Sequence, residues 1–195
     1  MRKDLLRSAL AVVGFTLVLG LAYPLVMTGI AQVAFPQKAD GSLIKDADGK
    51  VIGSTLLARD VKDSPRYFHP RPSATGYSPS VTYFANRGPN QRATKILTRQ
   101  HLDAYIKAEK PYNPTLTPAR VPIDAATFSA SGVDPHISKA NAAIQARRIA
   151  AVRRLPLDRV RQLIADSTDG RGLGVFGEPG VNTTVLNLAL DQEAR

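Results

Sequence analysis

The sequence predicts an α+β fold, with one N-terminal transmembrane helix followed by a single mixed α/β domain outside the cytoplasm. Three observations indicate this: an uncharged apolar run from Ser8 to Gln37, helical periodicity between residues 140 and 164, and two segments rich in aliphatic and β-branched residues. A chain of 195 residues suits one domain with an attachment. We therefore divide it into a cytoplasmic N-terminus at 1–7, a transmembrane helix at 8–35 and an extracytoplasmic domain at 36–195.

The composition excludes several classes of protein. Hydrophobic residues make up 44% of the chain, which is too many for a disordered protein. The absence of cysteine excludes a disulfide framework, a thiol nucleophile and a thiolate zinc site. The 26 lysines and arginines outnumber the 16 aspartates and glutamates, and the net charge of +10 would by itself favour nucleic acid or an anionic membrane as a partner.

The apolar run is predicted to be an uncleaved membrane anchor. Ser8 to Val33 would extend about 39 Å as a helix, which is enough to cross a hydrocarbon core of roughly 30 Å. A cleaved secretory signal is the alternative, but the run is longer than a signal's apolar region and lacks a clear cleavage pattern. Because Arg2, Lys3 and Arg7 precede the run, we expect a single-pass protein of the inner (plasma) membrane, with its N-terminus in the cytoplasm and its large domain outside. Nucleic acid is implausible as a partner there.

Two features of the run suggest more than a plain anchor. Pro24 lacks the backbone donor that would reach the carbonyl of Gly20, so we expect a kink or a closely packed neighbouring helix there. Thr16 and Gly20 form a small-x-x-x-small pair that lets another helix approach. We therefore expect the helix to pack against partner helices.

The first part of the outer domain is predicted to consist mostly of loops. Turn residues precede a short strand or hairpin over residues 51–61. Nine of the 14 prolines fall between Pro65 and Pro122, so this stretch should be extended and superficial, with one helix near residues 91–110. Seven of the 12 aromatic residues lie in the same stretch. They suit a binding face, and packing of the loops against the core explains them equally well.

The second part predicts two helices and a strand. Asp134-Pro135 is a good helix opening, and an alanine-rich helix continues over residues 140–155 until Pro156 ends it. Apolar residues at the helical period predict another helix from Leu157, which frays at 166–170. The largely aliphatic segment at 181–190 predicts a strand that returns to a small sheet covered by helices.

Candidate catalytic groups are few. His69, His101 and His136 lack the spacing of a metal site, and we expect no bound metal. Residues 172–177 match a dinucleotide-binding G-x-G-x-x-G pattern, but a helix precedes them and Glu178-Pro179 follows, so a glycine-rich turn is the better interpretation. The sequence also has no G-x-x-x-x-G-K-[ST] phosphate loop.

Positive charge is concentrated in one stretch of the outer domain. The seven cations there are Lys139, Arg147, Arg148, Arg153, Arg154, Arg159 and Arg161, opposed only by Asp158. Such a face would suit lipid headgroups, a phosphate backbone or an acidic protein surface. A merely solvated helix face is the plainer alternative.

Several blocks of the sequence resemble one family. They are RYFHPRPSAT at 66–75, SASGVDPHIS at 129–138, Gln145-Ala146 with Arg148, LG at 173–174, GEP at 177–179, VN at 181–182 and LNLALD at 186–191. In this order they resemble the C subunit of the Kdp potassium-transporting ATPase, from the membrane segment to the C-terminus. One block departs from the pattern, because Ala85 to Asn90 keeps only part of the family's Ser-Asn-x-Gly-Pro-Ser-Asn run.

The resemblance implies a non-catalytic accessory subunit of an ATP-driven potassium importer, with no active site of its own. Its partners would be the ATPase, channel-like and small membrane subunits of the pump, which it would assemble and stabilise. The chain itself has no Asp-Lys-Thr-Gly phosphorylation motif.

The resemblance also implies a catalytic chaperone that raises the ATP affinity of the ATPase subunit. No cofactor would be bound tightly, and ATP would be met transiently, with Gln145 and Arg148 as candidate contacts. ATP is cytoplasmic, however, whereas the predicted topology places Gln145 outside. A scaffold that clamps the channel-like subunit from outside fits the sequence better.

Two other functions stay open as alternatives. A membrane-tethered binding protein for anionic polymers or lipid headgroups would use the basic stretch. A tethered hydrolase would use His69 or His136, but no arrangement of base, nucleophile and oxyanion site can be assembled from the sequence.

Overall fold

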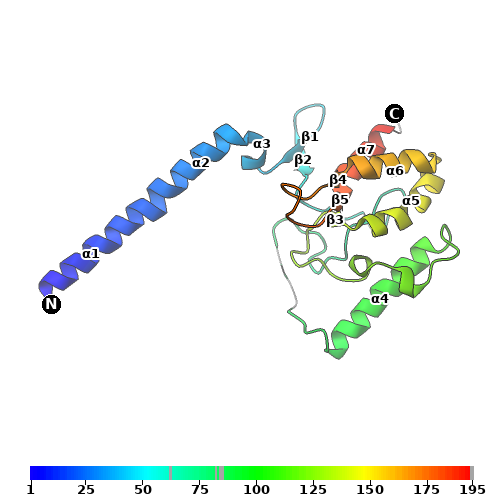
Figure 1. The fold of residues 1–195 in the computed structure, drawn as a ribbon, viewed down its shortest axis with the longest axis horizontal. Coiled ribbons are helices and arrows are strands. Elements are labelled where there is room, and N and C mark those ends of the chain that lie inside the picture. The colour runs from blue at the N-terminus through cyan, green and yellow to red at the C-terminus, as the bar shows by residue number, and fades with distance from the viewer. Residues whose placement is uncertain (62, 82, 84–85, 194–195) are drawn as a thin grey trace. The chain divides into compact units, whose positions relative to one another are not determined.

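A computed structural model describes residues 1–61, 63–81, 83 and 86–193, and it confirms the mixed helix and strand composition (Figure 1). The chain forms two compact units, Met1–Ser54 and Thr55–Arg195. The boundary between them follows a first β-hairpin and does not coincide with the end of the apolar helix.

One long helix contains the predicted membrane segment. It consists of α1 (Arg2–Leu17), a π-helical turn (Val18–Ala22) and α2 (Tyr23–Ala34), and its 33 residues are long and apolar enough to cross a membrane. None of these side chains is buried within the chain. Its apolar surface is therefore free to meet lipid or another helix.

Pro24 is accommodated by a change of helix type. The amide of Tyr23 donates to the carbonyl of Val18, five residues back, where an α-helix would use the fourth. A π turn of this kind is one of the recognised disturbances of a helix ladder, and here it lies directly before the residue that lacks a donor. The helix continues beyond it through α2 (Figure 1).

A β-hairpin follows the short helix α3 (Pro36–Ala39). Its strands β1 (Leu43–Lys45) and β2 (Val51–Ser54) pair antiparallel. The carboxylate of Asp46 accepts hydrogen bonds from two backbone amides of the connecting turn, which is a common role for aspartate. The predicted strand is confirmed at its start, Val51–Ser54, but it ends well before residue 61. A hairpin within 51–61 is wrong, because the partner strand β1 precedes that segment, among the residues predicted as turn.

The described part of the second unit contains four α-helices and a three-stranded sheet. The helices are α4 (Arg92–Glu109), α5 (Lys139–Arg153), α6 (Leu157–Asp166) and α7 (Thr183–Glu193), with 3-10 turns at Pro118–Arg120 and Ile123–Ala125. The strands are β3 (His136–Ile137), β4 (Thr168–Asp169) and β5 (Gly180–Asn182). β5 lies between the other two and pairs antiparallel with both, so the predicted small sheet with helices around it is confirmed (Figure 1).

The hydrophobic core of this unit lies among α5, α6, α7 and the sheet. Its buried members are Phe68, Ile137, Ala142, Ala146, Ile149, Val160, Leu163, Val181, Leu186 and Leu190. Each large side chain among them contributes about 1.5–3 kcal/mol by leaving water. Phe68 comes from the proline-rich stretch, so this core ties that stretch to the helices that follow it.

The proline-rich stretch folds as loops around one helix, as predicted. α4 lies within one residue of the expected bounds at each end. The hydroxyl of Tyr77 donates to the carbonyl of Arg71, and that of Tyr105 donates to Oδ1 of Asn141 at 2.8 Å. These contacts, with the buried ring of Phe68, favour packing over a binding face. Phe84, another aromatic residue of the stretch, lies outside the described residues.

The prediction that Asp134-Pro135 opens a helix is wrong. α5 begins at Lys139, and its cap is Ser138, whose hydroxyl accepts a hydrogen bond from the amide of Asn141 at 3.1 Å. Asp134-Pro135 precedes β3, where the carboxylate of Asp134 accepts the amide of His136. The first helix ends at Arg153, two residues earlier than predicted, with Arg154 in the left-handed conformation. The second helix after Pro156 is confirmed.

The prediction of a strand at 181–190 is also wrong beyond Asn182. α7 occupies 183–193, and Oδ1 of Asn182 accepts the amides of Thr184 and Val185, which caps the helix. Leu186 and Leu190 then share one fully buried face, four residues apart. A short aliphatic run is compatible with either a buried strand or a buried helix, and here the cap decides between them.

Candidate functional site

The candidate nucleotide contacts Gln145 and Arg148 lie on the buried side of α5. Their side chains are among the largest in the chain to be fully buried, with exposed fractions of 1% and 2%. A charge or an amide in such a place must find partners inside the protein, because an unpaired polar group is costly to remove from water.

Arg148 is held by one carboxylate, two carbonyls and one amide. Its Nε donates to Oε1 of Glu109, at the end of α4, over 2.8 Å. Its Nη1 donates to the carbonyls of Pro65 and Tyr67, at 2.5 and 3.0 Å, and its Nη2 donates to Oε1 of Gln145 at 2.9 Å. Arg148 thus joins two helices to the loop that precedes Phe68.

Glu109 is as deeply buried as its partner, with 1% exposed. Burial raises the pKa of this carboxyl, and the guanidinium of Arg148 opposes that shift. Among the described residues no protein group hydrogen-bonds its second oxygen, Oε2. Both partners of this ion pair are buried, so the pair is a structural contact inside the second unit.

The amide of Gln145 is fully engaged. Its Nε2 donates to the carbonyl of His69 and to Oδ1 of Asn141, at 3.0 and 2.9 Å. Its Oε1 accepts the amide of His69 at 2.8 Å as well as Nη2 of Arg148. Two donors and two acceptor positions are all that such a side chain has, so Gln145 holds the loop at His69 much as a neighbouring strand would.

The sequence blocks singled out above contact one another in the fold. The hydroxyl of Ser73 donates to the carbonyl of Gly132 at 2.6 Å, which joins block 66–75 to block 129–138. The side-chain amide of Asn187 bonds both backbone groups of Phe68, which joins block 66–75 to block 186–191. Gly132 has φ of 77°, and a Cβ there would lie 2.7 Å from Oγ1 of Thr75, so only glycine fits this junction.

The three histidines are separate and have different surroundings. The ring of His69 hydrogen-bonds the carbonyl of Ser64, and burial together with the charge of Arg148 lowers its pKa to about 4. The ring of His101 contacts the carbonyl of Ala126 and packs edge-on against Phe128. In the described chain no group of three or more His, Cys, Asp or Glu side chains could hold a metal ion.

His136 has two carboxylate neighbours. Its Nε2 lies 2.7 Å from Asp169 and its Nδ1 lies 3.3 Å from Asp134. The hydrogen bond with Asp134, acting against burial and helped by Asp169, raises the pKa of His136 to about 9. At neutral pH His136 is therefore an imidazolium that joins β3 to β4, which is unsuited to the role of general base in the hydrolase alternative.

The predicted basic face between residues 139 and 161 is not a continuous cationic surface. Four of its seven cations are paired: Arg148 with Glu109, Arg153 with Asp191, Arg159 with Glu193 and Arg161 with Asp158. Arg153 also packs over the ring of Tyr67. Successive residues of a helix point in different directions, so cations that are close in the sequence do not form one continuous positive surface.

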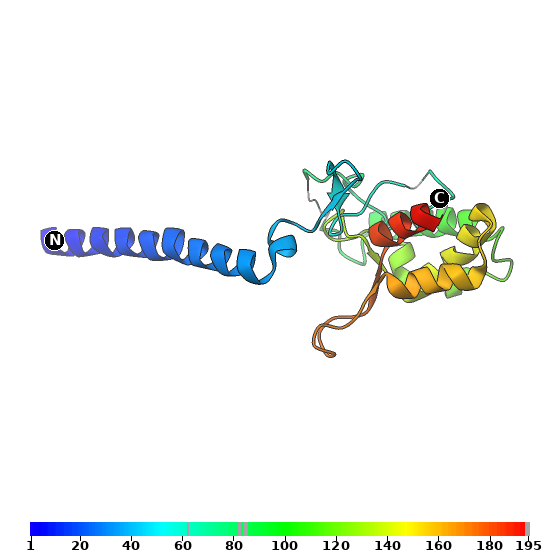
Figure 2. The same cartoon turned by 90° about the horizontal axis from the view of Figure 1, so that it is seen from above.

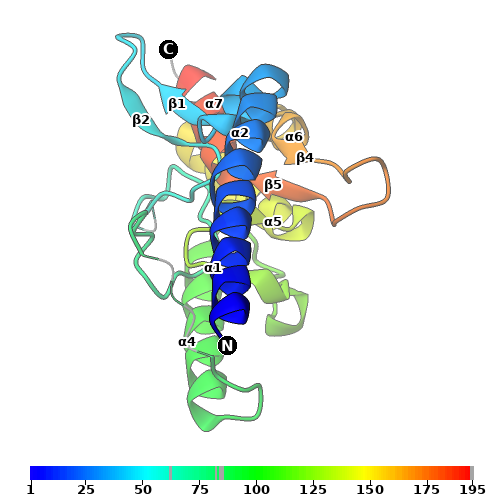
Figure 3. The same cartoon turned by 90° about the vertical axis from the view of Figure 1, so that its left-hand side faces the viewer.

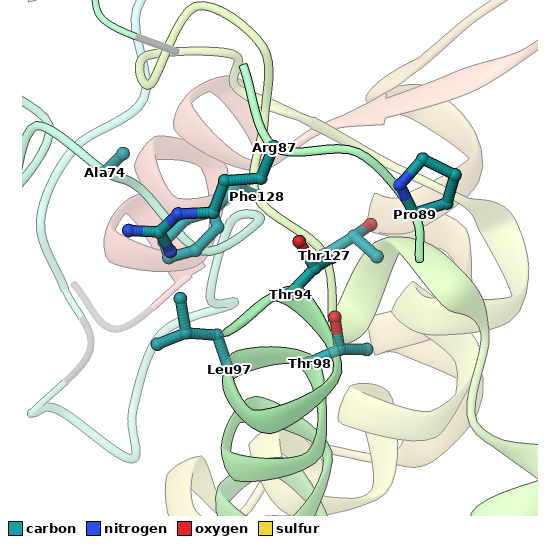
Figure 4. A pocket seen from close by; sticks show the side chains of 8 residues that line it. All are labelled: Ala74, Arg87, Pro89, Thr94, Leu97, Thr98, Thr127 and Phe128. Carbon is teal, nitrogen blue, oxygen red and sulfur yellow. The ribbon is translucent and has the colours of Figure 1, made fainter. Parts of the chain in front are cut away.

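A cleft of about 260 Å³ lies beside the first turns of α4 (Figure 4). The residues that line it are Ala74, Arg87, Pro89, Thr94, Leu97, Thr98, Thr127 and Phe128. It includes part of the divergent block from Ala85 to Asn90, of which Ala85 lies outside the described residues. None of the predicted site residues lines this cleft.

Comparison with known proteins identifies the family. The family model described as K+-transporting ATPase, c chain (KdpC) matches residues 5–192. The chain belongs to the KdpC family. Its resemblance to that family, drawn from the blocks at 66–75, 129–138 and 186–191, is thereby confirmed.

Three KdpC proteins illustrate the likeness, and each is named a potassium-transporting ATPase KdpC subunit. That of Caulobacter vibrioides (strain NA1000 / CB15N) is 47% identical over 190 residues, which cover 95% of this chain and 92% of the relative. That of Polaromonas naphthalenivorans is 47% identical over 193 residues, covering 97% and 95%. That of Bradyrhizobium diazoefficiens is 42% identical over 208 residues, covering 100% and 99%.

In this KdpC chain, two important partners were not among the predicted residues. Glu109 gives no signal in the sequence, because its charge is matched by an arginine 39 positions later on another helix. Asn187 does give one, since it is the single polar residue in an otherwise aliphatic segment at 185–190. Such a residue in a buried segment indicates a required hydrogen bond.

Proposed function

We propose that the chain assembles and stabilises the ATPase, channel-like and small membrane subunits of an ATP-driven potassium importer, and that it performs no chemistry of its own. The family match over residues 5–192 carries this proposal. The network around Arg148 supports it, because the polar atoms of Gln145 and Arg148 form hydrogen bonds that hold the fold together. The chain therefore acts through contacts between its surface and the other subunits, and not through reactive groups.

Purification from detergent tests the assembly role. A tagged chain should bring down the other subunits in fixed proportion, with potassium-stimulated ATPase activity. A chain that purifies alone and binds anionic polymers or lipid headgroups in a salt-sensitive manner would instead support the tethered binding protein.

We further propose that the chain is a single-pass protein of the plasma membrane, with Met1 in the cytoplasm and the unit after Thr55 outside. The cations Arg2, Lys3 and Arg7 before the long helix support this orientation. The absence of cysteine allows a direct test, because Ile123→Cys introduces one thiol at a position with 72% of its side chain exposed. An impermeant maleimide should label it in intact spheroplasts, and labelling only from the cytoplasmic side would refute the orientation.

We propose that the chain also raises the ATP affinity of the ATPase subunit, and that it does so through contacts between the subunits. Direct contact of ATP with Gln145 or Arg148 would require the loop at residues 65–69 to open, since that loop takes their hydrogen bonds. With Gln145→Ala in the assembled pump, we expect any rise in KM for ATP to accompany a fall in thermal stability. A changed KM at unchanged stability would point to direct contact.

A further inference from the structure

Three large apolar side chains are exposed together on the segment that connects β4 to β5. Leu173, Val175 and Phe176 have exposed fractions of 92%, 70% and 67%. We call these three residues the apolar tip. Figures 2 and 3 show this segment, in orange, projecting from the body of the second unit. Grouped apolar side chains on a projecting segment are typical of a binding surface.

The backbone of the apolar tip is ordered by its own hydrogen bonds. Gly172 and Phe176 exchange two backbone bonds, of 2.8 and 2.9 Å. Leu173 adopts φ of 51°, a conformation that is unfavourable for leucine, and Gly174 follows with φ of 79°. The tip thus combines a strained backbone with an exposed aliphatic side chain, two costs that a partner pocket would offset.

Two ionic contacts hold the segment below the tip. Arg171 donates through Nη2 to both carboxylate oxygens of Glu178, at 2.9 and 3.1 Å. Closer to the sheet, His136 binds Asp169, and Gly180 lies so near His136 that a Cβ would approach its ring at 3.3 Å. These contacts join the two arms of the segment to each other and to β3 below the tip.

The charge of this segment distinguishes between a lipid surface and a protein. Residues 168–179 carry Asp169, Arg171 and Glu178, a net charge of −1, although the whole chain carries +10. The one cation of this segment is paired with Glu178. Membrane-binding segments surround their apolar residues with free lysine and arginine that meet anionic headgroups. A neutral to acidic, shaped tip fits an apolar pocket in a protein instead.

We propose that the apolar tip inserts into an apolar, uncharged pocket of a partner subunit, with the ring of Phe176 as its anchor. This inference rests on the proposed function as an accessory subunit. Aromatic side chains that become fully buried carry a large share of binding energy at interfaces, and Phe176 is the aromatic residue of the tip.

Site-specific labelling of the full-length chain tests the proposal. Val175→Cys places a single thiol at the tip and keeps Phe176, while Ile123→Cys is a control with nearly the same exposed fraction, 70% against 72%. The thiol at position 175 should react rapidly with maleimide in the purified chain alone and be protected in the detergent-solubilised complex. Rapid reaction of the thiol at position 123 in the lone chain shows that the reagent is active.

A second variant measures the contribution of the anchor. Phe176→Ser should weaken association with the other subunits on the order of tenfold or more, the effect of losing a buried anchor. Ile123→Ser should leave association unchanged. Because both positions are exposed in the chain, the thermal midpoint of each purified variant should match that of the unsubstituted chain.

Four outcomes would overturn this proposal and leave the proposed function standing. A thiol at position 175 that reacts equally fast in the complex and alone would do so, as would Phe176→Ser chains that associate normally. Protection of this thiol by lipid vesicles alone would assign the tip to a membrane, and protection that rises with the concentration of the lone chain would assign it to a second copy. If the unsubstituted chain itself fails to copurify with any subunit, the proposed function fails, and this inference fails with it.

Discussion

Arg148 and Glu109 show what a buried charge pair does at the scale of single residues. Removing both charges from water is expensive, and their attraction with the surrounding hydrogen bonds roughly offsets that cost. The pair therefore adds little net stability, but it fixes where α4, α5 and the loop at residues 65–67 meet. Breaking one side of the pair leaves the other charge buried and unmatched.

We expect Glu109→Gln to lower the free energy of unfolding by about 3–5 kcal/mol, since Arg148 would lose its counter-charge at a site that bulk solvent does not reach. Chemical denaturation of the purified chain measures this loss. Asp158→Asn, which removes the exposed pair with Arg161, is the matched control and should change stability little. Equal effects of the two substitutions would contradict a structural role for the buried pair.

His136 gives the chain a pH-dependent contact. Its pKa is raised to about 9 when folded, compared with about 6.5 for an unfolded histidine. A raised folded pKa stabilises the fold fully below the unfolded pKa, and that contribution is lost as the pH rises through the folded pKa. The window for this loss runs from about pH 6.5 to about pH 9.

We therefore expect the difference in thermal stability between the unsubstituted chain and His136→Gln to shrink as the pH is raised across that window. Thermal unfolding at a series of pH values provides the measurement. His69→Gln is the control, because the pKa of His69 is lowered to about 4 and its ring stays neutral throughout the window. A constant difference for His136→Gln would contradict the imidazolium contact.

At the scale of elements, helix starts are set by caps. α5 starts where Ser138 can cap it, and the carboxylate of Asp124 in turn accepts bonds from the amide and hydroxyl of Ser138. α7 starts where Asn182 caps it, and Nδ2 of Asn182 also donates to the carbonyl of Thr55. Each capping residue is thus itself hydrogen-bonded to a residue from elsewhere in the chain. The cap therefore sets both where the helix starts and where it lies in the fold.

We expect Asn182→Ala to destabilise the chain by about 1–2 kcal/mol, because α7 loses its cap and Thr55 loses a donor. Thermal or denaturant unfolding of the full chain tests this. Asn182→Ser restores a capping oxygen but does not reach Thr55, so its stability should lie between those of Asn182→Ala and the unsubstituted chain. A serine variant no better than alanine would argue against the cap.

At the scale of the whole molecule, the second unit contains its own core. All the core residues from Phe68 to Leu190 lie after Thr55, and so do Arg148 and all its partners. The long apolar helix has no buried side chain in the described structure. We therefore expect the second unit to fold without the helix.

We expect a fragment of residues 55–195 to fold without the long helix and to unfold cooperatively on heating, as followed by circular dichroism. A fragment of residues 70–195 is the matched comparison. It lacks Phe68 and the carbonyls that Arg148 needs, and should not form a cooperative fold. If the shorter fragment were equally stable, the loop at residues 65–69 would not be part of the core.

Composition and local pattern were enough for much of this protein. The long apolar helix, the strand that begins at Val51, α4, the interruption between α5 and α6 and the glycine-rich turn at 172–177 all follow from period, proline and glycine. Those features act over a few residues. The motif blocks were also enough to identify the family.

Contacts between distant parts of the chain decided the rest. Four of the seven cations between Lys139 and Arg161 proved to be paired with carboxylates, and the segment after Asn182 proved to be a helix. Gln145, which the family resemblance suggested as a contact for ATP, bonds the backbone of His69, 76 residues away. The sequence states which charges and amides are present, but their partners depend on burial, and burial is a property of the packed chain.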